Sequence, residues 1–177
     1  TDHAIRLRGV CKHYPPFSLG DVALDVPTGS ITGFIGANGA GKSTTIRIIM
    51  GLVTADSGEI EVLGHRIPEA TSRAKQDTGY VSEDMRLFPR ATLQWHMDFV
   101  AQVFGAWDAA YAATLVRRFD LRPEQRIKGM SHGQRIKAGL LLALARRPRL
   151  LVLDEPTTGL DPVARQEVIG ALTDVVR

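Results

Sequence analysis

The sequence predicts an α/β fold, and three observations lead to this prediction. Short apolar runs with the two-residue alternation or the continuity of strands occur along the chain. Other stretches repeat their apolar residues at helical spacing, and a glycine-rich segment joins one strand-like run to one helical run. The 177 residues, 44% hydrophobic and 23% charged, are enough for one full-sized core. One compact domain, with room for a subdomain, is therefore expected.

The charge pattern and the apolar runs exclude several classes of function. The net charge of +3 comes from 22 basic and 19 acidic residues spread along the chain, so no strongly cationic face and no nucleic-acid partner are expected. The apolar run from Leu140 to Ala145 is far shorter than the ~18 residues of a membrane span. A role at a membrane would therefore go through a partner protein.

The N-terminal third predicts three strands. Ile5 and Leu7 alternate with arginines, and a similar alternation returns over residues 22–26, which is typical of half-buried strands. The run from Ile31 to Ile35 is more evenly apolar, as a buried parallel strand is.

A glycine-rich segment follows this run and precedes apolar residues at helical spacing. It reads Gly36-Ala37-Asn38-Gly39-Ala40-Gly41-Lys42-Ser43-Thr44 and matches the phosphate-loop pattern of P-loop NTPases in its strand-to-helix context. The glycines allow successive backbone N–H groups to turn toward a phosphate chain at the start of a helix. We expect Lys42 to hold the β- and γ-phosphates, Ser43 a magnesium ion and Thr44 an α-phosphate. The alternative is a glycine turn without a ligand.

The middle of the chain predicts two strands followed by helices. The strands are Glu59 to Leu63 and Thr78 to Ser82. Residues 93–119 are helical in pattern, and most of their aromatic side chains are expected in the core. Another helix follows Ser131 and runs to Ala145.

An apolar strand from Arg149 to Leu153 ends in the carboxylates Asp154 and Glu155, and a last helix starts at Pro162. Open α/β sheets bind ligands at the carboxyl ends of their strands. Asp154 would orient magnesium, and Glu155 would polarise the water that attacks the γ-phosphate. A strand followed by an acidic turn is the alternative, but together with the glycine loop the pair predicts nucleoside triphosphate hydrolysis.

Three segments in a fixed order carry a resemblance to a known family. They are Ser131-His132-Gly133-Gln134, the strand ending in Asp154, and Glu155-Pro156-Thr157-Thr158-Gly159-Leu160-Asp161. This arrangement resembles the signature, Walker B strand and D-loop of the nucleotide-binding domains of ABC transporters, over residues 4–177. The resemblance implies a RecA-like core with an antiparallel β subdomain in residues 1–84 and 147–177, and an inserted α-helical subdomain in residues 85–146.

The resemblance also assigns nucleotide contacts across a head-to-tail dimer. Ser131, Gly133 and Gln134 would contact the nucleotide held by Lys42 of a second ABC ATPase domain, in a homodimer or a heterodimer. Asp161 would reach across the same interface. For Ser131 and Asp161, capping of their own helices is the alternative.

Two further residues match family positions one by one. Tyr14 corresponds to the aromatic residue that stacks on adenine, and ordinary packing is its alternative. Glu83 stands where most of the family has the Q-loop glutamine, so it would contact magnesium and take part in catalysis. A solvent-facing acid is the alternative there. With residues 79–84, Glu83 looks similar to the bacterial ABC-2 type exporters.

The sequence departs from the family pattern at two places. His132 replaces the first glycine of the signature, while Gly133 is retained. The switch histidine expected after the helix that starts near Pro162 does not occur before Arg177. The expectation is therefore a C-terminally truncated domain that binds ATP but hydrolyses it poorly.

The implied function is an ATP-binding and hydrolysing subunit, with ATP and Mg²⁺ as cofactors, that powers a separate membrane permease. Such a subunit is cytoplasmic and peripheral on the inner face of the cell membrane. The region around Phe88 would receive the coupling helix of the permease. The alternatives are a non-transport ABC ATPase, in translation or chromosome maintenance, and an unrelated phosphate-loop enzyme such as a kinase.

Overall fold

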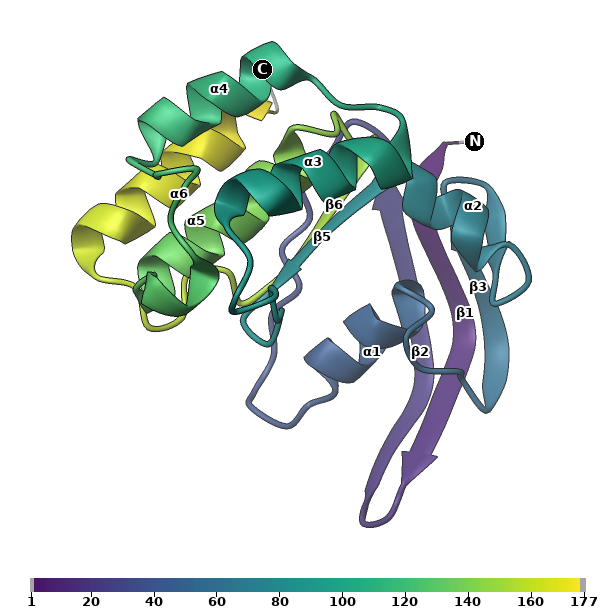
Figure 1. Cartoon of the computed structure of the whole chain (residues 1–177). Coiled ribbons are helices and arrows are strands. Elements are labelled where there is room, and N and C mark those ends of the chain that lie inside the picture. The colour runs from purple at the N-terminus through teal and green to yellow at the C-terminus, as the bar shows by residue number, and fades with distance from the viewer. Residues whose placement is uncertain (1, 176–177) are drawn as a thin grey trace. The chain divides into compact units, whose positions relative to one another are not determined.

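The computed structural model describes residues 2–175 and divides into two compact units, residues 1–78 and residues 79–177 (Figure 1). Thr1, Val176 and Arg177 of the expected domain lie outside the described residues. The division of the chain into a core and a helical insert at residues 85–146 stays a prediction.

The first unit is built on a four-stranded antiparallel sheet, with the strand order β2-β1-β3-β4. Its strands are β1 (His3–Tyr14), β2 (Phe17–Pro27), β3 (Ser57–Val62) and β4 (His65–Ile67). Leu7 of β1 pairs with Leu24 on one side and with Ile60 on the other, and its side chain is fully buried. The two alternating N-terminal strands predicted from the sequence are therefore confirmed.

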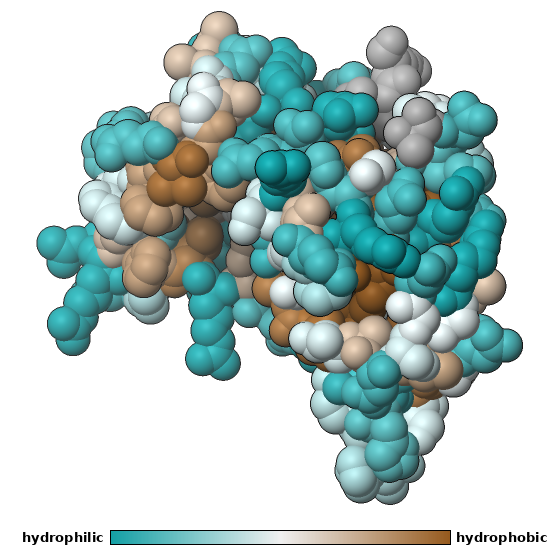
Figure 2. Space-filling model, turned by 90° about the vertical axis from the view of Figure 1, so that its right-hand side faces the viewer, coloured by the Kyte–Doolittle hydropathy of each residue, from teal (hydrophilic) through white to brown (hydrophobic). Residues whose placement is uncertain are grey.

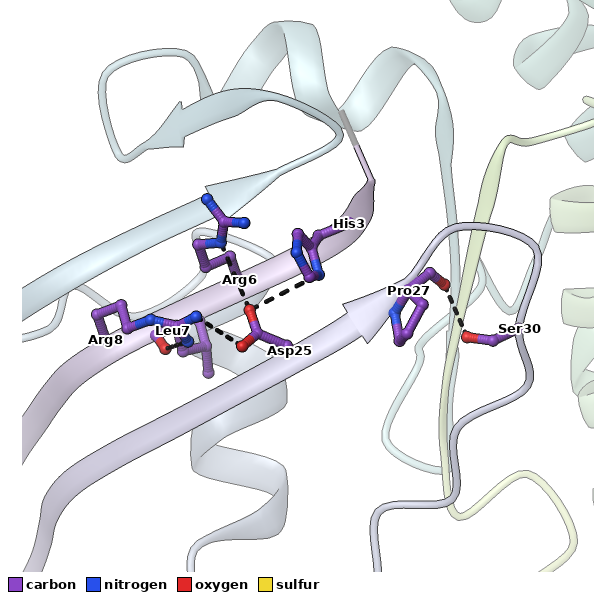
Figure 3. A network of polar contacts seen from close by, with 7 residues as sticks. All are labelled: His3, Arg6, Leu7, Arg8, Asp25, Pro27 and Ser30. Carbon is purple, nitrogen blue, oxygen red and sulfur yellow. Dashed lines mark hydrogen bonds and ion pairs between the residues drawn. The ribbon is translucent and has the colours of Figure 1, made fainter.

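An acidic residue on β2 ties together three basic side chains of β1 (Figure 3). Asp25 accepts a 2.6 Å hydrogen bond from Arg8 and lies 3.4 Å from Arg6 and 3.7 Å from His3. The hydrogen bond from Arg8 holds the pKa of the Asp25 carboxyl below its usual range. The loop that leaves β2 is fixed by Ser30, whose hydroxyl donates to the Pro27 carbonyl over 2.7 Å.

Two helices belong to the first unit. Helix α1 (Lys42–Ile49) buries Ile46, Ile48 and Ile49, as its apolar spacing predicts. Helix α2 (Thr71–Gln76) and strand β4 were not predicted, since six and three residues are too few to establish a period. Figure 2 shows hydrophilic residues over much of the face drawn there, with brown hydrophobic patches between them.

The predicted buried strand from Ile31 to Ile35 is wrong in the described structure. These residues form no strand, and Ile31 and Ile35 are 75% and 91% exposed. A strand requires a neighbouring strand to pair its N–H and C=O groups. Within residues 2–78 the paired strands are β1, β2, β3 and β4, and residues 31–35 pair with none of them.

The second unit contains a pair of strands and a group of helices (Figure 1). Its elements are β5 (Thr78–Ser82), α3 (Leu93–Phe104), α4 (Ala109–Arg118), a short 3₁₀ helix (Ile127–Gly129), α5 (His132–Leu144), β6 (Leu150–Asp154) and α6 (Pro162–Val175). Strand β5 pairs with β6, which agrees with the two strands predicted here. One hydrophobic cluster lies among these elements and includes Val81, Leu93, Leu115, Phe119, Leu140 and Val168.

The helical region at residues 93–119 differs from the prediction in two ways. It is two helices, because Gly105 ends α3 with a φ of 61°. The aromatic stripe of α3 is also not core: Trp95 and Phe99 are 44% and 46% exposed. The buried residues of α3 are Leu93, His96 and Met97, so the stripe lies on another face of the helix. Phe119, in contrast, is buried as expected.

None of the helices within residues 2–175 combines the length and the apolar character that crossing a membrane requires.

Candidate functional site

The glycine loop of the first unit closes on itself at the start of α1. The Lys42 ammonium donates to the carbonyls of Gly36 and Ala37 over 2.8 and 3.0 Å, and the Ala40 N–H donates to Ala37 O over 3.1 Å. Lys42 is the first residue of α1, so the loop that its side chain closes lies at the N-terminus of this helix. A compact cationic loop at a helix N-terminus is suited to a phosphate chain.

The glycines of this loop are required by its conformation. Gly39 and Gly41 have φ values of 81° and 93°, which side-chain-bearing residues rarely adopt. A Cβ at Gly41 would lie 2.6 Å from Leu19 Cδ1 and 3.2 Å from Phe17 Cζ. Gly41 therefore allows the start of α1 to pack closely on β2.

The hairpin that Gly41 approaches also carries Tyr14, the predicted adenine contact. Tyr14 ends β1 and is 39% exposed. The Lys12 ammonium lies 5.3 Å from the centre of its ring, and Lys12 also pairs with Asp56 over 2.7 Å. The ring is exposed enough to accept a stacking partner, and both the adenine contact and the alternative of ordinary packing stay open.

Two of the predicted acidic residues of the second unit are joined through their backbones at the ends of β5 and β6. The Glu83 N–H donates to the Asp154 carbonyl over 3.3 Å, which places the two residues side by side. Glu83 and Glu155 are exposed, whereas Asp154 is 9% exposed. Glu155 has a φ of 51°, an uncommon conformation for a residue with a side chain.

The signature segment forms a helix cap. The Ser131 hydroxyl accepts from the Gln134 N–H over 3.2 Å, and the Gln134 side-chain oxygen accepts from the Ser131 N–H over 2.9 Å. This reciprocal pair is a capping box at the start of α5. Ser131 therefore caps its own helix, and whether Ser131, Gly133 and Gln134 also contact a nucleotide stays a prediction.

Asp161 caps α6 in a similar manner. Its Oδ1 accepts from the N–H groups of Val163 and Ala164, both over 3.0 Å. These bonds, that of Ala164 above all, hold the pKa of the Asp161 carboxyl below its usual range. Asp161 therefore caps its own helix, and its reach across a dimer stays a prediction.

Two contacts at this place were missed by the sequence analysis. The Thr158 hydroxyl donates to Glu155 Oε2 over 3.0 Å, and His132 Nε2 lies 3.1 Å from the Thr158 carbonyl. The first joins residues three positions apart in one turn and could have been suspected from the sequence. The contact between His132 and Thr158 joins residues 26 positions apart, and no local sequence pattern predicts it.

The predicted site residues thus form two groups, each described within its own unit. The glycine loop and Tyr14 belong to residues 1–78, and the carboxylates, the signature and the 155–161 turn belong to residues 79–177. Across residues 2–175, no three His, Cys, Asp or Glu side chains are placed to hold a metal by themselves. Magnesium is commonly held by one or two protein ligands together with phosphates and water, so the roles of Ser43, Glu83 and Asp154 at a metal stay predictions.

A phosphate loop between a sheet and a helix, and an acidic turn after an apolar strand, define the class of P-loop NTPases. Within that class the family is shown by comparison with known proteins. Residues 19–158 match the family model described as "ABC transporter", so the chain belongs to the ABC transporter family.

Two curated relatives illustrate the similarity. The chain is 33% identical to the ABC transporter ATP-binding protein YtrB of Bacillus subtilis, over 89% of this chain and 54% of that protein. It is 34% identical to the Nod factor export ATP-binding protein I of Cupriavidus metallidurans, over 91% of this chain and 55% of that protein. The chain therefore spans about half the length of these relatives.

A solved structure supports the fold assignment. The structure of an ATP-binding subunit of an ABC transporter matches with a TM-score of 0.87 and 30% identity, over 98% of this chain and 75% of that one. The predicted α/β fold of the P-loop NTPase type is therefore confirmed.

Proposed function

We propose that this chain carries the ATP-binding and hydrolysing machinery of an ABC transporter and works with a separate membrane permease. The observation that carries the proposal is the closed loop of residues 36–44, spanned by Lys42 at the start of α1, in a chain of this family. The relatives described above are named as ATP-binding proteins for transport or export, which supports this function over the non-transport alternative.

The residues of the loop have distinct tasks in this proposal. Lys42 would exchange its two carbonyl partners for the β- and γ-phosphate oxygens, while the backbone N–H groups of residues 36–44 bind the phosphate chain. Tyr14 would stack on the adenine ring. A magnesium ion held by Ser43, Glu83 and Asp154 would neutralise phosphate charge.

Glu155 would orient a water molecule toward the γ-phosphorus and accept its proton, so that ADP and inorganic phosphate leave. Ser131, Gly133, Gln134 and Asp161 would complete this site from a second ABC ATPase domain in a head-to-tail dimer. ATP binding would then close the dimer and hydrolysis would reopen it. In this proposal the protein lies on the cytoplasmic face of the cell membrane, attached through the permease.

The shared site is tested by the nucleotide dependence of dimer formation. We expect the Glu155→Gln protein to elute from a size-exclusion column as a dimer with Mg-ATP and as a monomer without it. Glu155→Gln combined with Lys42→Ala is the matched control and should stay monomeric under both conditions. A Glu155→Gln protein that binds ATP and nevertheless remains a monomer would contradict the dimer proposal.

An exposed aromatic cluster, consisting of Phe88, Trp95 and Phe99, is the proposed contact for the permease. Phe88 and Trp95 pack edge to face with ring centres 5.5 Å apart, and Trp95 stacks on Phe99 at 5.3 Å. Buried His96 fixes the start of the cluster, because its Nε2 accepts from the Phe88 N–H over 3.0 Å while its Nδ1 lies 2.8 Å from the Thr92 carbonyl. Exposed aromatic groups held in a fixed position are typical of protein interfaces.

The cluster is tested by introducing a charge. We expect Phe88→Asp to abolish co-purification with the permease and to leave ATP affinity within about twofold of the wild type. Ile169→Asp is a suitable control, since Ile169 is an exposed apolar residue of α6 outside the cluster. Equal loss of co-purification in both variants would argue against this surface.

A further inference from the structure

His132 stands where the family pattern has the first glycine of the signature, and its side chain contacts the turn that follows β6. Its side chain is partly buried, and its Nε2 lies 3.1 Å from the carbonyl oxygen of Thr158. A carbonyl oxygen can only accept a hydrogen bond, so Nε2 must carry a proton and donate it. A glycine at position 132 could not make this bond.

The residue that accepts this bond is itself in contact with the proposed catalytic carboxylate. The Thr158 hydroxyl donates to Glu155 Oε2 over 3.0 Å. One side of Thr158 is therefore held by His132 through its backbone, and the other side holds Glu155 through its hydroxyl. The three residues form a continuous hydrogen-bonded connection from the first turn of α5 to the end of β6.

Gly159 leaves room for the imidazole of His132 beside the turn. A Cβ at Gly159 would lie 3.4 Å from His132 Nε2, and Gly159 has a φ of 69°, so a side chain here would meet both strain and a close contact. Next to the histidine, a Cβ at Gly133 would lie 3.5 Å from Leu160 Cδ2 and 3.7 Å from Ala164 Cβ. The 155–161 turn is thus joined to the start of α5 by the hydrogen bond from His132, and it lies close enough to α5 that Gly133 faces Leu160.

The exposure and the backbone conformation of Glu155 explain why such support matters. Its side chain is exposed and its backbone φ of 51° lies in a region that costs free energy for a residue with a Cβ. A catalytic carboxylate must be held close to its productive orientation to act on a water molecule.

We propose that His132 is a positioning residue for ATP hydrolysis: it fixes the Thr158 backbone so that the Thr158 hydroxyl orients the Glu155 carboxylate. This inference rests on the proposed function, since it assumes that Glu155 acts in hydrolysis. It differs from the dimer role of the signature, because the effect of His132 is exerted on the Glu155 of its own chain.

The first test separates turnover from nucleotide binding. In the full chain, His132→Ala should lower kcat about 5- to 10-fold, the effect of one hydrogen bond, while KM for ATP stays within about twofold. His132→Gln should restore kcat to within about twofold of the wild type, because a glutamine amide can place an N–H donor near the position of Nε2. An unchanged kcat in His132→Ala, or a change confined to KM, would overturn the inference.

The second test asks whether His132 acts through Thr158. Thr158→Val removes the hydroxyl with little change of shape, and Thr158→Ser retains it as the matched control. In the Thr158→Val background, His132→Ala should lower kcat by less than about twofold, because the connection is already broken. Independent, multiplying losses of kcat in the double variant would show that His132 acts by another route.

A measurement without nucleotide keeps the inference separate from the proposed function. Hydrogen exchange of the amides of residues 157–161 should be about fivefold faster or more in His132→Ala than in the wild type and in His132→Gln. A wild-type protein that binds ATP without turnover would contradict the proposed function, and the exchange rates alone would then decide whether His132 holds the turn. Equal exchange in all three proteins would overturn the contact itself.

Discussion

The two units of this protein build their parts of the nucleotide machinery in different ways. In residues 1–78 the phosphate loop is determined by backbone conformation, with Gly39 and Gly41 at positive φ and one lysine closing the loop. In residues 79–177 the corresponding groups are held by side chains, namely a capping box, an aspartate cap and the His132–Thr158–Glu155 connection. A backbone-determined loop demands particular residue types in sequence, whereas a contact-determined turn depends on how separate elements pack.

The largest predicted effect is the loss of stability caused by a cavity in the core of the second unit. Phe119 is 1% exposed and belongs to the cluster that packs α5 and α6, whose first turns carry the signature and Asp161. Phe119→Ala should lower the free energy of unfolding of this unit by about 3–5 kcal/mol, through lost burial and the cavity left behind. Hydrogen exchange of the amides of α5 measures this loss within the unit.

Phe88→Ala provides the matched control, since it removes the same side chain from a position that is 61% exposed in the same unit. Its cost should be below about 1 kcal/mol, in the range of surface substitutions. If the two variants lost similar amounts of unfolding free energy, the burial of Phe119 would contribute little to the stability of this unit.

The same distinction explains which features could be predicted from the sequence. The loop of residues 36–44 and the helix after it were predicted from the sequence, because the conformation of the loop requires glycines at fixed offsets; the strand expected before the loop was wrong. The caps of α5 and α6 were foreseen as alternatives, because Ser131 and Asp161 stand directly before helical patterns. Features that depend only on neighbouring residues can therefore be recognised in the sequence.

Features that depend on tertiary pairing were predicted poorly. The apolar run from Ile31 to Ile35 looks like a buried strand, but a strand forms only where a neighbour supplies hydrogen bonds. The stripe of α3 has the spacing of a core face, yet Trp95 and Phe99 are exposed, because periodicity identifies an apolar face without showing what covers it. The hydrogen bond between His132 and Thr158 joins residues 26 positions apart, so no local sequence pattern predicts it.

A smaller effect tests whether the backbone determines the loop of the first unit. Gly41→Ala places a Cβ at a φ of 93° and 2.6 Å from Leu19 Cδ1, so it adds strain to a close contact. We expect it to destabilise this unit by about 1–3 kcal/mol, as measured by hydrogen exchange of the β1 amides. ATP affinity should fall as well, since α1 begins at the next residue.

Gly29→Ala separates the two causes of this effect. Gly29 has a φ of 73°, and a Cβ there would meet nothing within 4 Å, so only the conformational cost of about 1–2 kcal/mol applies. ATP affinity should be unchanged. If Gly41→Ala proved no more damaging than Gly29→Ala in both measurements, the close packing of α1 on β2 would be unimportant for the loop.

The smallest expected effect compares one carboxylate from each unit. The pKa values of Asp25 and Asp161 are both lowered, mainly by the Arg8 guanidinium for Asp25 and mainly by the Ala164 N–H for Asp161. A lowered folded-state pKa contributes stability above the unfolded-state value of about 3.9, and this contribution is lost as the pH falls through the folded-state pKa. Both carboxylates should therefore stabilise their units at neutral pH and cease to do so in acid.

Salt distinguishes the two cases, because an exposed ion pair is screened while hydrogen bonds within the first turn of a helix are fixed by its geometry. In carboxyl NMR titrations, 1 M NaCl should move the pKa of Asp25 back toward its ordinary value and leave that of Asp161 low. Arg8→Ala should raise the pKa of Asp25 even at low salt, which controls for effects of salt on the whole protein. Equal salt shifts at both residues would mean that charge, and not the backbone cap, governs Asp161, and the contrast between the two carboxylates would then be lost.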